Sequence, residues 1–378
     1  MTLPGLTVGM LGGGQLGRMS LLAGRHLGLR FVVFEPSPSS CAAPVADSVC
    51  ADSYDDLEAV RRFAQAVDVA TLEFENVPRE AAEAVAELVP LRPGARALSV
   101  CQHRLREKTF LKQAGLPHAP FGVAEDPAGL GEVLRAMRGP CVVKTAAFGY
   151  DGKGQVKVDD PAQADAEAIW TALGEPPGVV VEQWISHQGE VSVIVARGVD
   201  GKTTCFPMAE NLHQDHILFM SVVPARVPEA LVAEGQALAI KIAQELDVVG
   251  LIAVEMFVTE QGLIVNEMAP RPHNSGHYTL DACATSQFEQ HMRAVAGLPL
   301  GATTLHTPAV MVNLLGDLWA EGPPDFERLL ADPSVALHLY DKGEARPGRK
   351  MGHFTVCDAS LSAALARAQA AYENLAGR

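Results

Sequence analysis

The chain has 378 residues, of which 48% are hydrophobic and 20% are charged, a balance typical of a globular protein with more than one core. Its formal net charge of -15 disfavours nucleic acid as a partner, because a polyphosphate backbone would be repelled. The seven cysteines form no Cys-x-x-Cys pair, which predicts reduced thiols in a cytoplasmic protein. No segment approaches the roughly 18 apolar residues of a membrane span, so no membrane partner is expected.

Strand and helix patterns alternate over roughly the first 95 residues. They are predicted as strand, helix, strand, helix, strand and helix at 6–11, 15–28, 31–35, 54–66, 67–74 and 80–90. Crossovers this short predict an open parallel α/β sheet with helices on both faces.

The pattern breaks at Pro93 and Gly94, and a helix is predicted from 104 to Gly115. The next segments read as strand, glycine-rich turn and strand over 141–158, followed by two strands at 179–185 and 190–198 that bound a small sheet. The rest of the chain predicts an amphipathic helix, a strand–basic loop–strand unit and a closing helix, at 230–247, 335–356 and 359–376.

Two carboxylates mark the segment 251–272, which reads as a β-hairpin. A three-residue loop ending in Gly262 would pair Thr259 with Leu263 and place Glu255 opposite Glu267. Their Cβ atoms would then be about 5 Å apart on one face, among apolar neighbours. Because such carboxylates repel each other, the spacing predicts a divalent cation between them, and Mg²⁺ is the ion that combines carboxylates with substrate phosphates. The alternative is an exposed hairpin face with solvated charges.

A glycine-rich turn follows the first predicted strand. Residues 12–17 match G-x-G-x-x-G, and Glu35 ends the next strand where a ribose-binding acid is expected in dinucleotide-binding proteins. A dehydrogenase is therefore one alternative. The same glycines also serve any tight turn whose helix N-terminus receives an anion.

A second glycine-rich stretch, 148–155, lies between two predicted strands and surrounds Lys153. It fits a loop whose amides and ammonium close over phosphates, or else a plain Asp-Gly hairpin turn. Lys144, at the end of the preceding apolar run, fits either a phosphate contact or a solubilising lysine on an edge strand.

Seven blocks carry a resemblance that extends over nearly the whole chain. They are GGGQLGRM, TLEFENVP, KTAAFGYDGKGQ, VEQWISHQGEVS, ENLHQDHIL, VNEMAPRPHNSGH and YDKGEARPGRKMGH. In this order they resemble the ATP-grasp ligases, and among them the N5-carboxyaminoimidazole ribonucleotide synthetases of purine biosynthesis. The resemblance implies an α/β protein (α+β overall) with an N-terminal domain at 1–98, linker helices and a lid domain at 99–190, and a C-terminal domain at 191–378.

The resemblance also implies the ligands and their contacts. ATP and Mg²⁺ would be bound between the last two domains, with Glu255 and Glu267 as the metal ligands. The implied ATP contacts are Arg104 and Lys144 at the phosphates, Gly149, Tyr150, Asp151, Gly152, Lys153, Gly154 and Gln155 in the lid, Glu182, Gln183, Trp184 and Ile185 at adenine, Glu190 at the ribose, and His213, Asn266 and Glu267.

The implied substrates are bicarbonate and 5-aminoimidazole ribonucleotide, and the implied assembly is a homodimer. The substrate contacts would be Gln15, Leu16, Glu73, Tyr150, Lys153 and His273, with Lys342, Arg349 and Lys350 at the substrate phosphate. The sequence itself supports the phosphate site, because 341–350 holds four basic residues in an acidic protein, although a basic surface turn is the alternative. Asp151, Lys153 and His273 are the catalytic candidates.

Three features depart from the family pattern. Lys153 stands where many relatives have arginine, which keeps the charge and loses the bidentate fork. His216 stands where glycine is common, so a different local backbone is expected, and the segment after Glu267 leaves the ligands of a second metal open. A sister ligase that uses formate and glycinamide ribonucleotide, and a nucleotide sensor without catalysis, remain as further alternatives.

Overall fold

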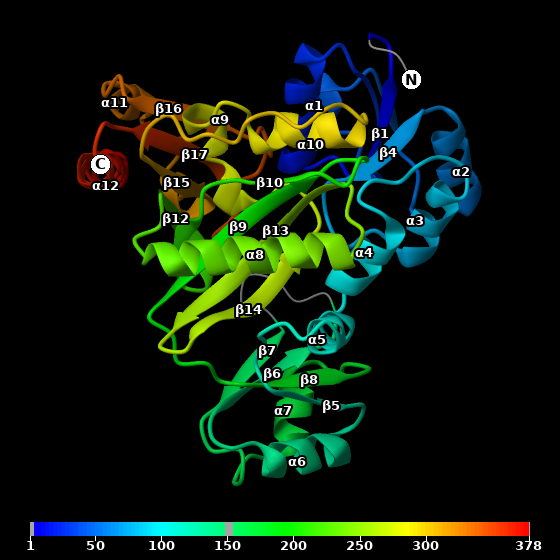
Figure 1. Cartoon of the computed structure of the whole chain (residues 1–378), viewed down its shortest axis with the longest axis vertical. Coiled ribbons are helices and arrows are strands. Elements are labelled where there is room, and N and C mark those ends of the chain that lie inside the picture. The colour runs from blue at the N-terminus through cyan, green and yellow to red at the C-terminus, as the bar shows by residue number, and fades with distance from the viewer. Residues whose placement is uncertain (1–3, 148–153, 378) are drawn as a thin grey trace.

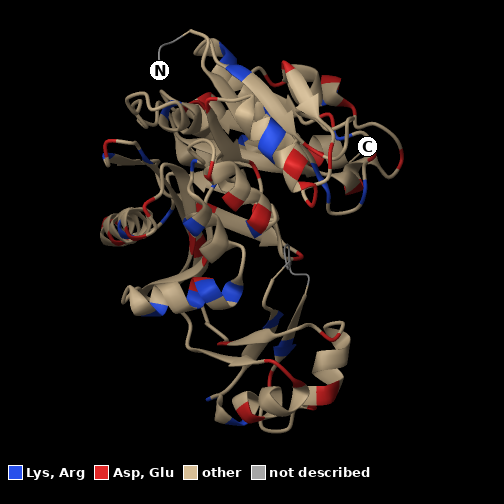
Figure 2. Cartoon of the chain, turned by 90° about the vertical axis from the view of Figure 1, so that its right-hand side faces the viewer, with Lys and Arg blue, Asp and Glu red and all other residues tan. Residues whose placement is uncertain are grey.

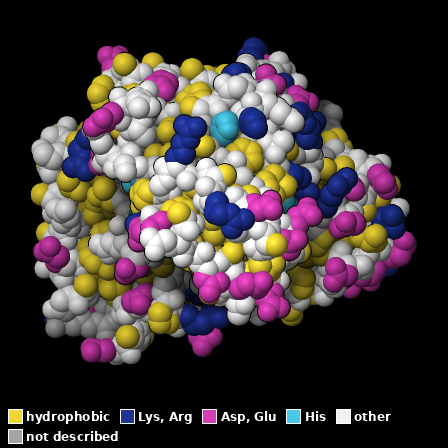
Figure 3. Space-filling view, turned by 90° about the horizontal axis from the view of Figure 1, so that it is seen from below, with side chains coloured by type: hydrophobic (Ala, Val, Ile, Leu, Met, Phe, Trp, Pro, Cys, Tyr) yellow, Lys and Arg dark blue, Asp and Glu magenta, His cyan; other side chains and the backbone are white. Residues whose placement is uncertain are grey.

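The computed structural model describes residues 4–147 and 154–377, and their strands form three sheets (Figure 1). Among these residues, none of the helices combines the length and apolarity needed to cross a bilayer. Basic and acidic residues are interspersed along the chain (Figure 2), and both kinds are mixed on the face seen from below (Figure 3). All seven cysteines are free thiols, as predicted.

The N-terminal sheet confirms the predicted parallel α/β unit. Its strand order is β3-β2-β1-β4, and every described pairing in it is parallel. Its elements are β1 (Thr7–Leu11), α1 (Gln15–His26), β2 (Arg30–Phe34), η1 (Ala43–Val45), β3 (Ser48–Cys50), α2 (Leu57–Gln65), β4 (Val69–Leu72) and α3 (Arg79–Ala86). The four residues of β4 are all buried, as expected for a parallel strand covered on both faces.

Two helices, α4 (Ala95–Cys101) and α5 (Arg104–Gln113), lead into a small antiparallel sheet at the bottom of Figure 1. Its order is β5-β8-β6-β7. The elements are β5 (Phe121–Ala124), α6 (Pro127–Ala136), β6 (Cys141–Thr145), β7 (Gln155–Val158), α7 (Ala166–Ala172) and β8 (Val179–Gln183). Trp170 of α7 and Leu130 of α6 share one core with these strands.

The remaining strands form a nine-stranded sheet in the order β14-β13-β9-β11-β12-β15-β17-β16, with β10 added to β9. Its strands are β9 (Gly189–Arg197), β10 (Thr203–Cys205), β11 (Ala209–Gln214), β12 (Ile217–Val223), β13 (Gly250–Thr259), β14 (Gly262–Ala269), β15 (Ala309–Leu315), β16 (Val335–Leu339) and β17 (Lys350–Cys357). The helices around it are α8 (Glu229–Glu245), η2 (Asn274–Gly276), α9 (Thr279–Ala282), α10 (Gln287–Val295), η3 (Gly316–Trp319), α11 (Phe326–Leu330) and α12 (Leu361–Ala376).

The assignment of 190–198 to the small sheet was wrong. This segment is β9, which pairs with β13 along its whole length and has six consecutive buried residues. An apolar run identifies a buried strand and does not say which sheet contains it. The domain boundaries at 98 and 190 stay a prediction.

The N-terminal sheet is joined to the large sheet through α10, which packs on α1 (Figure 1). His291 of α10 is completely buried, and its Nε2 lies 2.8 Å from the hydroxyl of Thr71 on β4. Burial lowers the pKa of His291 to about 3 from its ordinary 6.5. Burial also holds the pKa values of His277 and His353 well below the ordinary value.

These buried neutral histidines predict acid sensitivity. Below pH 6.5 such a histidine is protonated in the unfolded chain but stays neutral in the folded chain. The free energy of unfolding therefore falls as pH drops from about 6.5 toward about 3. Each such histidine contributes at most about 1.4 kcal/mol per pH unit to the slope of the unfolding free energy against pH. The free energy of unfolding is measured by urea denaturation at several pH values. We expect His291→Gln to reduce its pH dependence by the equivalent of about one proton, whereas His306→Gln, at an exposed position, leaves the pH dependence unchanged. Equal slopes in wild type and His291→Gln would contradict the prediction.

Candidate active site

One large cleft of about 1500 Å³ is lined by residues of the small sheet, of the nine-stranded sheet and of the segments that follow the strands of the N-terminal sheet. Most of the predicted site residues line it: Gln15, Leu16, Glu73, Arg104, Lys144, Gln155, Glu182, Gln183, Trp184, Ile185, Glu190, His213, Glu255, Asn266, Glu267, His273, Lys342, Arg349 and Lys350. Gly154 is described at the start of β7 and is not among the lining residues. Gly149, Tyr150, Asp151, Gly152 and Lys153 lie outside the described residues. One cleft therefore brings together segments that are far apart in the sequence.

Glu255 and Glu267 lie directly opposite each other on β13 and β14, as predicted. The predicted three-residue loop was wrong, because Thr259 pairs with Gly262 and the turn has two residues. Gly262 does have a positive φ of 119°. A bulge restores the predicted opposition, since Glu255 pairs with Glu267 while Met256 pairs with Val265, which leaves Asn266 as the extra residue.

Glu255 sits in a poorly solvated position. Burial, and then the neighbouring Glu267 carboxylate, raise its pKa to about 8. Its side chain is 19% exposed, and its Oε1 lies 3.4 Å from His273 Nε2. Glu267 itself is exposed toward the cleft. A carboxylate pair with this environment favours a cation between its oxygens.

His273 is held from several sides. Its Nδ1 lies 2.9 Å from the hydroxyl of Ser275, which receives a hydrogen bond of 2.8 Å from Ser192 on β9. The side chain of Gln287 bonds both the N–H and the C=O of His273, at 2.9 and 2.7 Å. Burial, with Arg271 next, keeps the pKa of His273 well below 6.5. The imidazole is therefore a neutral group in a fixed orientation beside Glu255.

Lys144 projects from β6, which lies inside the small sheet, so the edge-lysine alternative was wrong. Its Nζ lies 3.0 Å from Glu182 Oε1, and Lys108 Nζ lies 3.1 Å from Glu182 Oε2. Burial alone would raise the pKa of Glu182, but Lys108 and Lys144 hold that pKa below its ordinary value. Arg104 lies next to the same strand, because its Nη1 donates a hydrogen bond to the backbone O of Thr145, the residue after Lys144, at 2.9 Å.

Two neighbouring residues of α5 were missed by the sequence prediction. Lys108 Nζ also donates to the backbone O of Asn266 at 2.8 Å, and Glu107 Oε1 accepts from the N–H of Met268 at 2.7 Å. Burial raises the pKa of Glu107 to about 8. Helical phase was the available signal, because Glu107 lies three and four positions before Phe110 and Leu111 and so shares their buried face.

The glycine-rich turn binds carboxylates of the protein itself. Glu73 accepts hydrogen bonds from the N–H groups of Gly14 and Gly17, at 2.6 and 3.0 Å. Glu35 accepts from Gly13 N at 2.8 Å. The anion at this helix N-terminus is thus Glu73, and Glu35 is occupied by backbone rather than free for a ribose. This arrangement opposes the dehydrogenase alternative.

The hairpin of β16 and β17 brings Lys342, Arg349 and Lys350 to the cleft. Burial lowers the pKa of Lys342 to about 8, and its Nζ lies 5.6 Å from the centre of the Tyr340 ring. Arg349 Nη1 donates to Glu344 O at 2.7 Å. Three cationic side chains around one opening match the chemistry of a phosphate.

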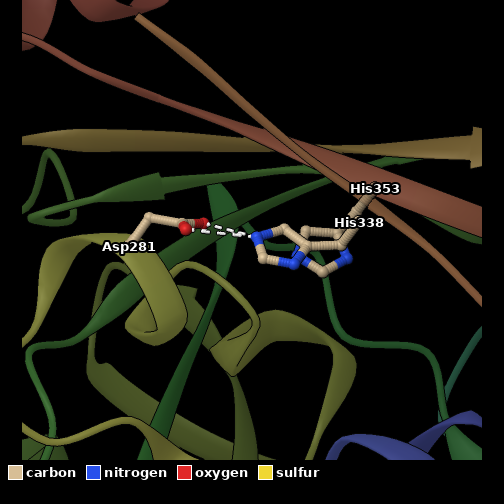
Figure 4. A group of neighbouring side chains, drawn as sticks. All are labelled: Asp281, His338 and His353. Atoms are coloured by element: carbon tan, nitrogen blue, oxygen red, sulfur yellow. Dashed lines mark hydrogen bonds and ion pairs between the residues drawn. The ribbon is translucent and has the colours of Figure 1, made fainter.

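A stack of histidines supports this hairpin (Figure 4). His338 and His353 face each other across β16 and β17, with ring centroids 4.6 Å apart and planes 13° apart. Asp281 accepts from His338 Nε2 at 3.0 Å, and Tyr340 Oη lies 2.8 Å from His353 Nδ1. Donor atoms of Asp281, His338 and His353 lie within 4.8 Å of one another, but parallel rings do not direct their nitrogens at one point. We interpret the group as a structural stack.

The opposite end of the cleft is lined by the segment that leaves β8. Gln183 Nε2 donates to Pro140 O at 2.9 Å, and Lys157 Nζ lies 4.6 Å from the centre of the exposed Trp184 ring. Glu190 Oε2 lies 3.5 Å from His213 Nδ1, and burial raises the pKa of Glu190. His216 has a positive φ of 65°, the conformation that favours glycine, so the expected difference from a glycine backbone stays a prediction.

Arg271 is a further cleft residue that carried no predicted role. Its Nε lies 2.7 Å from Glu75 Oε1, and this pair joins the end of β14 to the N-terminal unit. Burial would lower the pKa of Arg271, but Glu75 and other carboxylates raise it. Arg271 lies inside the block VNEMAPRPHNSGH, but the sequence did not identify which acidic residue it pairs with.

Three family models match consecutive parts of the chain: the ribonucleotide synthetase preATP-grasp domain at 6–102, the ATP-grasp domain at 109–288, and the phosphoribosylaminoimidazole carboxylase C-terminal domain at 309–367. The N5-carboxyaminoimidazole ribonucleotide synthase of Bacillus subtilis is 45% identical over 353 residues, covering 93% of this chain and 91% of the relative. That of Pseudomonas aeruginosa is 39% identical over 374 residues, covering 97% and 100%.

Solved structures agree with the sequence relatives. An N5-carboxyaminoimidazole ribonucleotide synthetase with ADP aligns with a TM-score of 0.91 and 43% identity, covering 98% of this chain and 97% of that one. The synthase of Aspergillus clavatus, in complex with ADP and 5-aminoimidazole ribonucleotide, aligns with a TM-score of 0.87 and 31% identity, covering 99% of both chains. The chain therefore belongs to the N5-carboxyaminoimidazole ribonucleotide synthase family of ATP-grasp ligases.

Proposed function

We propose that this chain uses ATP and bicarbonate to carboxylate 5-aminoimidazole ribonucleotide, forming N5-carboxyaminoimidazole ribonucleotide, ADP and phosphate. The observation that carries the proposal is one cleft that is lined by a carboxylate pair with Lys144 and by a second set of three basic residues, Lys342, Arg349 and Lys350. The first set suits a metal-bound triphosphate, and the second suits the phosphate of a ribonucleotide. The family relationship supports the same reaction.

Mg²⁺ fits the residues present. Glu255 and Glu267 offer only oxygen donors on adjoining strands, and burial together with the Glu267 carboxylate raises the pKa of Glu255 to about 8 although Lys350 and Arg271 act in the opposite direction. When bound, the ion would offset negative charge on the phosphoryl group as it moves. Lys144 and Arg104 would contact the ATP phosphates, and Glu182 keeps Lys144 oriented.

In the proposed reaction, a bicarbonate oxygen attacks the γ-phosphorus of ATP, and the bond to the bridging oxygen breaks to release ADP and form carboxyphosphate. The exocyclic amine of the substrate then forms a bond to the activated carbon, and phosphate leaves with the electron pair of the C–O bond. The amine proton must be removed. His273, fixed by Ser275 and Gln287, and Asp151 are the candidates for handling it. A closed cleft would protect carboxyphosphate from water.

The remaining contacts are proposed from the positions of the residues. Glu182, Gln183, Trp184 and Ile185 would surround adenine, and Glu190 would bind the ribose. Gln15, Leu16, Glu73 and His273 would contact 5-aminoimidazole ribonucleotide. A homodimer in the cytoplasm is the assembly and location that we propose from the family, and light scattering on the purified protein tests the first.

The reaction predicts a strict dependence on both substrates. We expect ADP release to require bicarbonate and 5-aminoimidazole ribonucleotide together, in magnesium buffer. Glu267→Gln should lower turnover on the order of a hundredfold, because a carboxylate ligand is lost. Glu260→Gln, in the turn of the same hairpin, is the matched control. ADP release driven by formate and glycinamide ribonucleotide would instead identify a sister ligase.

The pKa of Lys342 predicts a pH dependence for the ribonucleotide. Lys342 is cationic below about pH 8 and neutral above it, so affinity for the substrate phosphate should weaken as pH rises through that value. With ATP and Mg²⁺ saturating, kcat/KM for 5-aminoimidazole ribonucleotide should fall on the alkaline side. Lys342→Arg should remove the fall, since a guanidinium stays charged. An identical alkaline limb in this variant would exclude Lys342 as its origin.

A further inference from the structure

The strand that carries Glu267 lies at the edge of the nine-stranded sheet, with β13 on one side and, among the described residues, only an isolated bridge to His118 on the other. The outward N–H and C=O groups of such a strand need partners from elsewhere. Val265 N donates to Pro117 O at 3.0 Å, in the segment that follows α5. Within the described residues, the edge of β14 is therefore covered by α5 and its continuation rather than left to solvent.

Two side chains of α5, Glu107 and Lys108, bind the backbone on either side of Glu267. Lys108 Nζ donates to the C=O of Asn266 at 2.8 Å, one residue before Glu267. Glu107 Oε1 accepts from the N–H of Met268 at 2.7 Å, one residue after it. Asn266 is also the bulge residue that keeps Glu267 opposite Glu255. The two contacts thus restrain the part of β14 where the register could shift.

Lys108 connects this point to the small sheet. Its Nζ lies 3.1 Å from one oxygen of Glu182 on β8, and Lys144 on β6 lies 3.0 Å from the other oxygen. A short series of contacts therefore runs from the backbone beside Glu267, through Lys108 and Glu182, to Lys144. Lys108 is 1% exposed and Glu107 is 3% exposed. A charge as deeply buried as that of Lys108 and a polar group as deeply buried as the carboxyl of Glu107 both require fixed partners, so the geometry is closely defined.

We propose that Glu107 and Lys108 are positioning residues that hold the Glu267 strand and the lysine of the small sheet, Lys144, in one fixed relation across the cleft. The inference rests on the proposed function, because it assigns a metal to Glu267 and a phosphate to Lys144. In this role neither residue has to contact the reacting atoms, although Glu107 lines the cleft. They act through Asn266, Met268 and Glu182, so their loss should change the response to Mg²⁺ more than the response to the ribonucleotide.

The test is a split in kinetic constants. We expect Lys108→Met to raise the Mg²⁺ concentration for half-maximal ADP release about tenfold and to lower kcat about tenfold or more, as for other groups that orient metal ligands. KM for 5-aminoimidazole ribonucleotide should change less than about twofold, since its basic hairpin lies on other strands. Lys112→Met is the matched control, because Lys112 lies on the exposed face of the same helix.

A second pair of variants covers the case in which Lys108→Met does not fold. Glu107→Met removes the acceptor for Met268 N and should raise the Mg²⁺ requirement, whereas Glu107→Gln keeps an acceptor and should lie closer to wild type. Thermal unfolding of each variant is measured alongside. A folded variant that is less stable but has the wild-type Mg²⁺ dependence would overturn the proposal. Failure of wild type to release ADP with both substrates would instead overturn the proposed function.

Discussion

The opposition of two carboxylates across β13 and β14 is the constraint on which the rest of the site depends. Glu255 and Glu267 repel each other, and Glu255 is too poorly solvated for water to screen the repulsion. Without a bound cation, burial and this repulsion raise the pKa of Glu255 to about 8, so proton uptake by Glu255 relieves the repulsion at neutral pH. A divalent ion between the two carboxylates removes the repulsion, and the relief of that repulsion favours binding of the ion.

The other parts of the cleft are arranged around this pair. The small sheet supplies Lys144, the β16–β17 hairpin supplies three basic residues, and His273 lies beside Glu255 at the start of η2. Positive charge is thus placed locally in a chain whose net charge is -15. Anionic substrates meet cations only where the fold has gathered them, which gives direction to binding without a broad basic surface.

Sequence reasoning succeeded where a local pattern was sufficient. The predicted strands and helices of the N-terminal unit were confirmed because helix and strand periods differ clearly there, whereas the three-residue edge strand β3 was missed. The opposition of Glu255 and Glu267 was confirmed although the turn was one residue shorter, because the bulge at Asn266 compensated. The sheet membership of β9 was wrong, since pairing partners are set by tertiary packing.

The partners of buried charges were also beyond sequence reasoning. Lys108 and Arg271 look like ordinary surface residues in a helix and a loop, and their partners Glu182 and Glu75 are distant in the chain. Only for Glu107 did the sequence offer a sign of burial, because its helical spacing places it on the same face as Phe110. The family resemblance supplied the expected ligand contacts, which stay predictions, whereas the contacts that orient those residues required coordinates.

The carboxylate of Glu73 occupies the amides of the glycine-rich turn before any ligand arrives. A side chain anchored at both oxygens has little rotational freedom left to lose when a substrate hydroxyl approaches it. The N-terminal wall of the cleft is therefore preorganised, and the entropy of ordering falls on the ligand and on other segments of the chain. In the proposed complex, specificity at this wall would rest on a rigid template, which discriminates by shape as well as by charge.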